Sequence, residues 1–267
     1  MMDLSNKLLL ANGCSHMAGL YQGDRDDLYS PAMKQGRSPA AKLAKLTGME
    51  YGINLAAPGG SNDYIVRTTM QWIADNPGRL KDIFVLIGWT EGNRREQWWY
   101  YDPNAYDYVS RWEWKLPWWA GADRTHEYHH ERGGGPQRMQ ANDAERMVNN
   151  GKHDGDYLAF SRLYYQNCDP WWNQLARARQ IIQMQHLLSG LGIPYLFYNA
   201  DDDILPDDQI ALQLLDTTRF YQPYTFAGVE LRKKFEWGYC YHFDHDANEY
   251  LAGCMYEFMV NSPAYAG

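Results

Sequence analysis

Leu8-Leu-Leu-Ala-Asn-Gly-Cys-Ser-His-Met-Ala-Gly19 is the stretch of this chain that decides the fold. Its first four residues form a short apolar run that ends at an Asn-Gly pair, which is the pattern of a buried β-strand. Ser15 therefore lies where the strand leaves the sheet, and in parallel α/β sheets reactive groups gather outside the carboxyl ends of the strands. Two interpretations of Ser15 stay open on local sequence alone: a nucleophile, or the N-cap of a helix that begins at His16 or Met17.

Length, composition and charge exclude several classes of partner. The chain has 267 residues, of which 45% are hydrophobic and 22% charged, as expected for one large α/β domain or a domain with an insertion. A net charge of −8 without a basic stripe argues against nucleic acid. No apolar run approaches the roughly 18 residues of a membrane span. We expect no nucleic-acid or membrane partner and, because the N-terminus leads directly into the first strand, cytoplasmic synthesis without a signal peptide.

The cysteines and histidines show no metal-ligand spacing. Four cysteines are scattered without a CxxC pair, which predicts reduced thiols and no zinc site. Cys14 stays open as an alternative nucleophile beside Ser15. His126, His129 and His130 form a local cluster, but no carboxylate or cysteine stands at matching ligand spacing. We therefore predict no metal and no cofactor.

Alternating strand and helix signals predict a parallel α/β domain. Short apolar runs bounded by turn residues indicate buried strands, and apolar residues at helical spacing indicate crossover helices between them. Ser38-Pro39 opens the first crossover, with a favoured N-cap followed by proline at the first helical position. The predicted elements are strand 8–11, helix 39–46, strand 49–55, helix 62–76, strand 83–87, helix 158–191, strand 195–198, helix 207–217 and helix 249–259.

Some boundaries have more than one interpretation. The alternatives are Ser61 or Asn62 as N-cap of helix 62–76, Asp246 or Asn248 as N-cap of the last helix, and one or two helices in 158–191 with a joint at Asp169-Pro170. Residues 220–241 are predicted to be irregular, and the tail after the last helix is predicted to be loose.

An aromatic-rich segment interrupts this pattern between residues 93 and 156. The chain has 11 Trp and 21 Tyr, and six of the Trp lie in this segment: Trp98, Trp99, Trp112, Trp114, Trp118 and Trp119. A long segment without regular periodicity is uncommon inside a compact domain and is usually functional. We interpret it as an insertion, with short helices or a hairpin, between the two parts (1–92 and 157–267) of one α/β domain. Aromatic residues at this density indicate a protein interface or a surface that stacks on sugars.

Four short motifs stand at the predicted strand exits and before the last helix. They are Gly13-Cys-Ser-His16, Pro58-Gly-Gly-Ser-Asn62, Ile87-Gly-Trp-Thr-Glu91 and His242-Phe-Asp-His245. Their order resembles that of the SGNH hydrolases, also called GDSL-like esterases, and their wording resembles a branch often carried by tailed phages. The resemblance covers about residues 1–90 and 158–260. It implies a three-layer, flavodoxin-like parallel sheet with helices on both faces, and it leaves the insertion out.

The resemblance implies a serine mechanism. Ser15 would be the nucleophile and His245 the base. His242 stands where the family has an acid, and Asp244 and Asp246 are the adjacent carboxylates that are candidates to orient the base, with Asp244 included among the predicted catalytic residues. A Ser–His dyad remains feasible, because the third member of a triad mainly orients the imidazole. The alternative is that His242 and His245 are ordinary loop histidines.

The resemblance also implies an oxyanion site. The backbone N–H groups of Ser15 and Gly60 are candidate donors, together with a side chain at the exit of the third strand. The family has asparagine at that position and this chain has Thr90, so Asn62 in the glycine turn is a candidate replacement. The alternative for Asn62 is a plain helix N-cap.

Substrate contacts are predicted from Trp89, Arg94, Trp98 and Trp99. Tryptophan faces stack on sugar rings, and Arg94 would bind an anionic group of the substrate. A solvated, salt-bridged surface is the alternative for Arg94.

Three hypotheses of function follow. The first is a serine esterase that removes an acyl group, acetyl above all, from a carbohydrate or similar small ester. The second is a non-catalytic structural or attachment protein, for example a virion component, whose aromatic insertion contacts other virion proteins or copies of itself. The third is a lectin-like module that binds a glycan without cleaving it.

Overall fold

A parallel sheet of five strands forms the centre of the protein. The computed structural model describes residues 3–19, 36–57, 60–90, 97–100, 112–115, 170–200, 213–222, 231, 234–235 and 245–266. The strands of this sheet lie in the order β2-β1-β3-β6-β7, and all neighbours pair in parallel. Their bounds are β1 Leu8–Gly13, β2 Glu50–Asn54, β3 Ile83–Trp89, β6 Tyr195–Asn199 and β7 Phe220–Tyr221.

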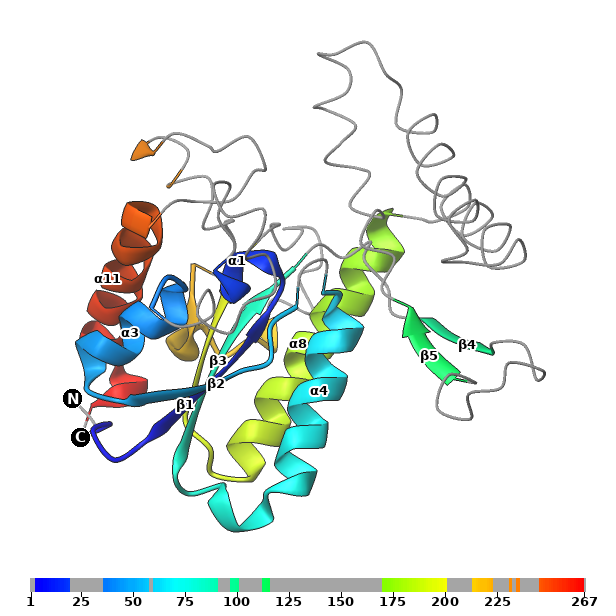
Figure 1. Ribbon diagram of the computed structural model, residues 1–267, viewed down its shortest axis with the longest axis horizontal. Coiled ribbons are helices and arrows are strands. Elements are labelled where there is room, and N and C mark those ends of the chain that lie inside the picture. The colour runs from blue at the N-terminus through cyan, green and yellow to red at the C-terminus, as the bar shows by residue number, and fades with distance from the viewer. Residues whose placement is uncertain are drawn as a thin grey trace.

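Helices cover both faces of the sheet and give three layers (Figure 1). Helices α3 and α11 pack side by side on one face, and α4 and α8 cover the other. The helices are α1 Ser15–Ala18, α3 Pro39–Thr47, α4 Asn62–Asp75, α8 Pro170–Gly190 and α11 His245–Asn261, with 3₁₀ turns at Pro77–Arg79, Thr217–Arg219 and Pro263–Tyr265. In the described ranges, no helix combines the length and the apolar character that crossing a membrane requires.

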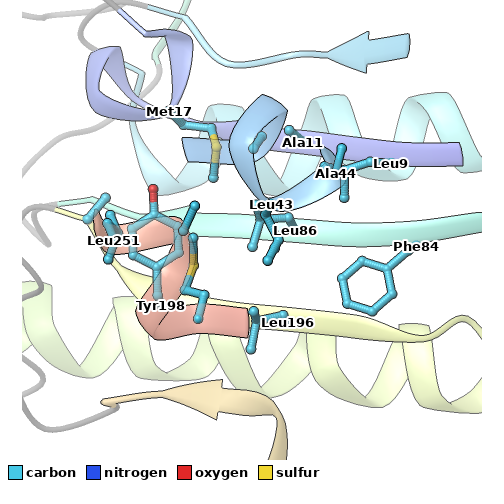
Figure 2. Packing of buried hydrophobic residues seen from close by; sticks show 14 of the residues in the cluster. Leu9, Ala11, Met17, Leu43, Ala44, Phe84, Leu86, Leu196, Tyr198 and Leu251 are labelled. Atoms are coloured by element: carbon cyan, nitrogen blue, oxygen red, sulfur yellow. The ribbon is translucent and has the colours of Figure 1, made fainter. Parts of the chain in front are cut away.

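Alternate residues of the central strands fill two separate apolar layers. On β3, Phe84 and Leu86 face α3 and α11, whereas Val85 and Ile87 face α4 and α8. Figure 2 shows the first layer, in which side chains of β1, β3 and β6 meet those of α3 and α11. This burial on both faces explains why β3 reads as a continuous apolar run rather than as an alternating one.

The predicted fold class is confirmed at the level of an α/β protein with a parallel sheet and helices on both faces, as in flavodoxin-like folds. The local signals for α3 are confirmed as well. The Ser38 Oγ accepts a hydrogen bond from the Ala41 N–H at 3.1 Å, and Gly48 ends the helix in the left-handed conformation. In the second crossover, Ser61 is the N-cap, because its side chain accepts from the Tyr64 N–H.

The boundaries of later elements differ from the sequence predictions. Helix α8 is described from Pro170, and residues 158–169 lie outside the described ranges, so one helix or two with a joint at Asp169-Pro170 stays an open prediction. The last helix begins at His245, so both candidate N-caps, Asp246 and Asn248, were wrong. Asn248 lies inside the helix, where its Nδ2 donates to the Arg37 carbonyl.

The C-terminal tail is packed rather than loose. The ring of Tyr265 is 1% exposed, lies 6.2 Å from that of Phe84, and its hydroxyl donates to the Tyr195 carbonyl at 2.6 Å. Residues 220–221 were predicted to be irregular but form β7, which pairs with β6. A strand of two residues is too short to show an alternating pattern in the sequence. The pairing of β7 with β6 and the contacts of Tyr265 also join segments that are far apart in the chain, which sequence patterns do not reveal.

The expected insertion is described only in part. Strands β4 Gln97–Tyr100 and β5 Trp112–Lys115 pair in antiparallel fashion, and the predicted hairpin is therefore found over these residues. The register places Trp98 opposite Trp114 and Tyr100 opposite Trp112. The remainder of 93–156 and the proposed domain boundaries at 92 and 157 lie outside the described residues, as does the predicted helix 207–217 up to residue 212. Its described end was wrong, because residues 214–216 are not helical and a 3₁₀ turn begins at Thr217.

Gly88 provides a test of the packing between β3 and β6. A Cβ at this position would lie 2.8 Å from the Cζ and hydroxyl oxygen of Tyr198, whose side chain is buried. We expect Gly88→Ala to destabilise the protein by about 1–3 kcal/mol through overpacking, measured by urea unfolding. Gly78→Ala is the control, since nothing lies within 4 Å of a Cβ there, and its effect should stay within about 0.5 kcal/mol. Equal effects of the two variants would contradict this account of the packing.

Candidate active site

The carboxyl ends of β1 and β3 meet at the centre of the sheet. Gly13 and Gly88 are register partners there. The chain passes from β1 to β2 on one side and then crosses to β3 on the other, so the strand order reverses between β1 and β3. Open α/β sheets bind ligands in the crevice outside such a switch point. Ser15 and Thr90 follow these two strands directly.

Ser15 is the first residue of the one-turn helix α1. Cys14 is the N-cap residue, without a side-chain capping bond, so the interpretation of Ser15 as a cap was wrong. Ser15 is 9% exposed. Within the described residues, neither its N–H nor its Oγ makes a hydrogen bond. The structure therefore holds a hydroxyl and a helix-start N–H together, with neither engaged by the described residues.

The glycine turn after β2 packs against the exit of β1. The Ala57 N–H donates to the Gly13 carbonyl at 3.2 Å, and a Cβ at Gly60 would lie 3.1 Å from the same oxygen. Glycine at 60 is thus required by the close approach of two backbones. The Gly60 N–H donates to the Ala57 carbonyl at 2.9 Å. In this conformation the turn itself uses the N–H that was predicted to be an oxyanion donor.

The Asn62 side chain forms hydrogen bonds with the backbone of Thr90. Asn62 is the first residue of α4 and not its N-cap, so the capping interpretation was wrong. Its carboxamide is 1% exposed and binds the backbone of Thr90 at two points: Oδ1 accepts from the Thr90 N–H at 3.0 Å, and Nδ2 donates to the Thr90 carbonyl at 3.1 Å. Two of the four predicted oxyanion residues are therefore adjacent, and the carboxamide of one fixes the backbone of the other.

His245 contacts charged groups of α3 and α11. Its Nε2 lies 2.9 Å from Lys42 Nζ and 3.6 Å from the Glu249 carboxylate, while Lys42 and Glu249 form an ion pair at 3.2 Å. Because a lysine ammonium has no acceptor, this geometry makes His245 Nε2 the acceptor. Between the described Ser15 and His245 there is no hydrogen bond. The structure does not bring the predicted pair together, and His242 and Asp244 lie outside the described residues.

Trp89 was wrongly predicted to contact substrate. Its side chain is 0% exposed, and its ring packs edge-on against Phe197 at 5.4 Å. The alternation of β3 explains this direction, since Trp89 continues the set of residues that faces α4 and α8. Trp98 and Trp99 lie on β4, where only the backbone is described, and Arg94 lies outside the described residues.

The described cysteines form no disulfide at this site. Cys14 is buried, and Cys254 on α11 is a free thiol. In the part of the chain that the structure describes, no three His, Cys, Asp or Glu side chains form a group that could hold a metal ion. His126, His129 and His130 lie outside that part.

Buried carboxamides at the strand exits were missed by the sequence predictions. Asn12 Nδ2 donates to the Ile65 carbonyl of α4 at 3.0 Å, and Asn199 Oδ1 accepts from the buried guanidinium of Arg177 at 2.7 Å. Asn54, which is half-buried, is the last residue of β2. A signal was present, because asparagine follows the predicted strands 8–11 and 195–198 and stands near the end of the predicted strand 49–55.

A comparison with protein families matches residues 24–128 to a family of unknown function, DUF6071. The matched segment contains Gly60, Asn62 and Thr90 but neither Ser15 nor His245. No curated protein and no solved structure matches the chain. The family description names no activity, so the function is argued from the geometry of the site.

Asn62→Leu tests the two-point contact with Thr90. Leucine has a similar volume but leaves the buried Thr90 N–H and carbonyl without the carboxamide. We expect a loss of about 2–6 kcal/mol in the free energy of unfolding, since each of the two buried hydrogen bonds that the variant removes costs roughly 1–3 kcal/mol. Asn261→Leu is the matched control, because the Asn261 carboxamide is exposed and bonds only within its own helix. A loss below about 1 kcal/mol for Asn62→Leu would show that the contact is dispensable.

Lys42→Met tests the cluster around His245. The pKa of Glu249 is lowered, first by the hydrogen bond from Lys42, then by the charge of Lys42, with lesser effects of His245 and Lys45. Lys42→Met should therefore raise the pKa of Glu249 towards the ordinary glutamate value, and Lys45→Met on the same helix should raise it less. An NMR titration of the side-chain carboxyl carbons measures both.

The sign of the effect on stability follows from the direction of this shift. Because the folded state has the lower pKa, the contact stabilises the fold above the ordinary pKa of glutamate and is lost as the pH falls through the lowered value. Equal shifts in the two lysine variants would mean that Lys42 and Glu249 are not in direct contact in solution.

Proposed function

We propose that this protein is a serine esterase of the SGNH type that removes an acyl group, acetyl above all, from a carbohydrate or a similar small ester. The observation that carries the proposal is Ser15. Its hydroxyl and N–H stand at the start of a helix, at the switch point of a parallel sheet, and no described group engages either of them.

Acyl transfer from this arrangement proceeds in two steps. The Ser15 Oγ attacks the ester carbonyl and loses its proton to a base, and the alcohol leaves with a proton from that base. Water then attacks the acyl-serine, which releases the carboxylic acid and restores the hydroxyl. The Ser15 N–H is the first candidate oxyanion donor, because the Gly60 N–H bonds within its own turn and the Asn62 carboxamide binds Thr90.

His245 serves as the base once its ring leaves Lys42. The side chain is 53% exposed, so little packing opposes a change of rotamer. Both nitrogens of a neutral imidazole cannot accept at once, and Nε2 accepts from Lys42 in this conformation. Proton transfer from Ser15 therefore requires that the contact with Lys42 is broken. Asp244 keeps its proposed role of orienting the ring, and His242 stays at the position where the family has an acid.

The proposed substrate is an acylated carbohydrate because of the aromatic insertion. Its described part is the β4–β5 pair, which brings Trp98 and Trp99 of one strand opposite Trp114 and Glu113 of the other. Tryptophan at this density suits a surface that stacks on sugar rings. Trp98 and Trp99 are retained as proposed substrate contacts, together with Arg94, whereas Trp89 is withdrawn.

A second candidate function is that of a non-catalytic structural or attachment protein, such as a virion component bound to other virion proteins or to copies of itself. The contact of His245 with Lys42 and Glu249, in place of one with Ser15, favours this candidate. Under it, the aromatic insertion packs against a partner chain and the fold serves as a scaffold.

Hydrolysis of p-nitrophenyl acetate by the wild type and by Ser15→Ala separates the candidates. We expect the wild type to release p-nitrophenol and Ser15→Ala to lose about a thousandfold in kcat/KM, because the nucleophile is removed. A fluorophosphonate probe should label the wild-type peptide that contains Ser15, as read by mass spectrometry.

Ser5→Ala is the matched control. Ser5 is exposed, its hydroxyl bonds to Asp3, and it precedes β1 at the opposite end of the sheet. This variant should keep its rate within about twofold. If neither p-nitrophenyl acetate nor a panel of acetylated glycans is hydrolysed above the buffer rate, and the probe does not label Ser15, the esterase proposal fails and the structural candidate replaces it.

A further inference from the structure

The carboxamide of Asn54 joins three segments around Ser15. Its Nδ2 donates to the Met17 carbonyl at 3.1 Å and to the Tyr51 hydroxyl at 3.0 Å, and its Oδ1 accepts from the Ala56 N–H at 3.0 Å. Both N–H donors and one acceptor position of the group are thus used. Each bond leads to a different piece of the site.

The first bond supports the helix that carries Ser15. Helix α1 has four residues, and a single helical turn is not stable alone, because nucleation costs more than one hydrogen bond returns. The last carbonyls of a helix also lack partners within the helix. Gly19 satisfies the Ser15 and His16 carbonyls with its N–H, and Asn54 satisfies the Met17 carbonyl. The end of α1 is therefore fixed by a side chain of β2.

The bond from the Ala56 N–H supports the glycine turn. Ala56 begins this turn, and the next residue, Ala57, donates its N–H to the Gly13 carbonyl. One end of the turn is thus tied to Asn54 and its middle to β1. Because Asn54 also holds Met17, the turn and α1 cannot move independently.

The bond to the Tyr51 hydroxyl connects Asn54 with α3. The Tyr51 hydroxyl lies 3.2 Å from Ser38 Oγ, which caps α3 by accepting from the Ala41 N–H. Ser38 is buried, and burial raises the pKa of the Tyr51 hydroxyl, so this hydroxyl stays protonated and able to donate. Hydrogen bonds therefore run without a break from the start of α3 through Asn54 to α1.

We propose that Asn54 is a positioning residue of the Ser15 site, whose carboxamide holds α1, the glycine turn and α3 as one unit and so fixes the direction of the Ser15 Oγ and N–H. The kinetic part of this inference rests on the proposed esterase function. The structural part does not, because it concerns the stability of α1 itself.

Asn54→Asp is the variant that isolates the donors. The side chain keeps its shape and still accepts from the Ala56 N–H, but an oxygen replaces Nδ2 and faces the Met17 carbonyl. Asn261→Asp is the matched control, since it removes the same donor from an exposed bond to the Glu257 carbonyl near the end of α11. Tyr51→Phe is a milder variant, which breaks the link to α3 and leaves the bond to Met17.

Hydrogen–deuterium exchange of the amides gives the readout that does not depend on activity. In Asn54→Asp we expect exchange in residues 15–19 to rise at least tenfold, while residues 83–89 of β3 stay within twofold of the wild type. Tyr51→Phe should show a smaller rise in exchange in residues 15–19. If Asn54→Asp does not fold, the exchange of Tyr51→Phe in these residues tests the inference in its place. Asn261→Asp should change neither segment.

Ester hydrolysis gives the second readout. A misdirected nucleophile lowers kcat and leaves substrate binding intact, so kcat of Asn54→Asp should fall at least tenfold with KM within about threefold of the wild type. Unchanged exchange in 15–19, or an equal rise in 15–19 and 83–89, would overturn the inference even if the wild type is an esterase. The expected local rise in exchange in a protein without esterase activity would instead refute the proposed function and leave the positioning of Ser15 by Asn54 intact.

Discussion

Hydrogen bonds from carboxamides are the constraint on which the carboxyl edge of this sheet depends. The central strands β1, β3 and β6 are largely apolar up to their exits, and each chain segment must then turn away without leaving buried polar groups unsatisfied. Asn54 and Asn199 are the last residues of β2 and β6, and Asn12 is the last residue but one of β1. Each of the three bonds to a neighbouring helix, while Asn62 binds the residue that follows β3. A carboxamide offers donors and an acceptor in one rigid plane, so one side chain can fix two backbones at once.

Much of the fold was predictable because its signals are local. The residues of β3 form an apolar run. Ser38-Pro39 predicts the start of a helix, because serine is a favoured N-cap and proline fixes a helical backbone angle at the first position. The failures at β7 and at the C-terminal tail have one cause, namely contacts between distant segments. Strand β7 exists because two residues extend the sheet beside β6, and the tail is ordered because Tyr265 reaches the Tyr195 carbonyl.

The candidate site was predictable in position but not in connections. A serine after an apolar run, with a glycine turn after the next strand, was enough to place Ser15 and Gly60 at one edge. The sequence did not predict which side chains form hydrogen bonds with one another. The Lys42–His245 contact spans 203 positions in the sequence, and the sequence shows no reason why Asn62 binds Thr90 rather than a substrate.

Two features of the site bear on the proposed acyl transfer in opposite directions. The available Ser15 hydroxyl supports it, and the contact of His245 with Lys42 counts against it. The Ser15 Oγ has no hydrogen-bond partner among the described residues, and it is not one of the buried polar atoms without a partner, so it is open to water or to a substrate. The contact of His245 with Lys42 lies on a half-exposed surface, where ion pairs and charged hydrogen bonds are weak and easily exchanged for water. Engaging His245 with Ser15 would therefore need only the breaking of a weak contact. Among the described residues the Ser15 hydroxyl is therefore available at the exit of β1, and only a weak contact keeps His245 elsewhere, so the arrangement is compatible with the proposed acyl transfer.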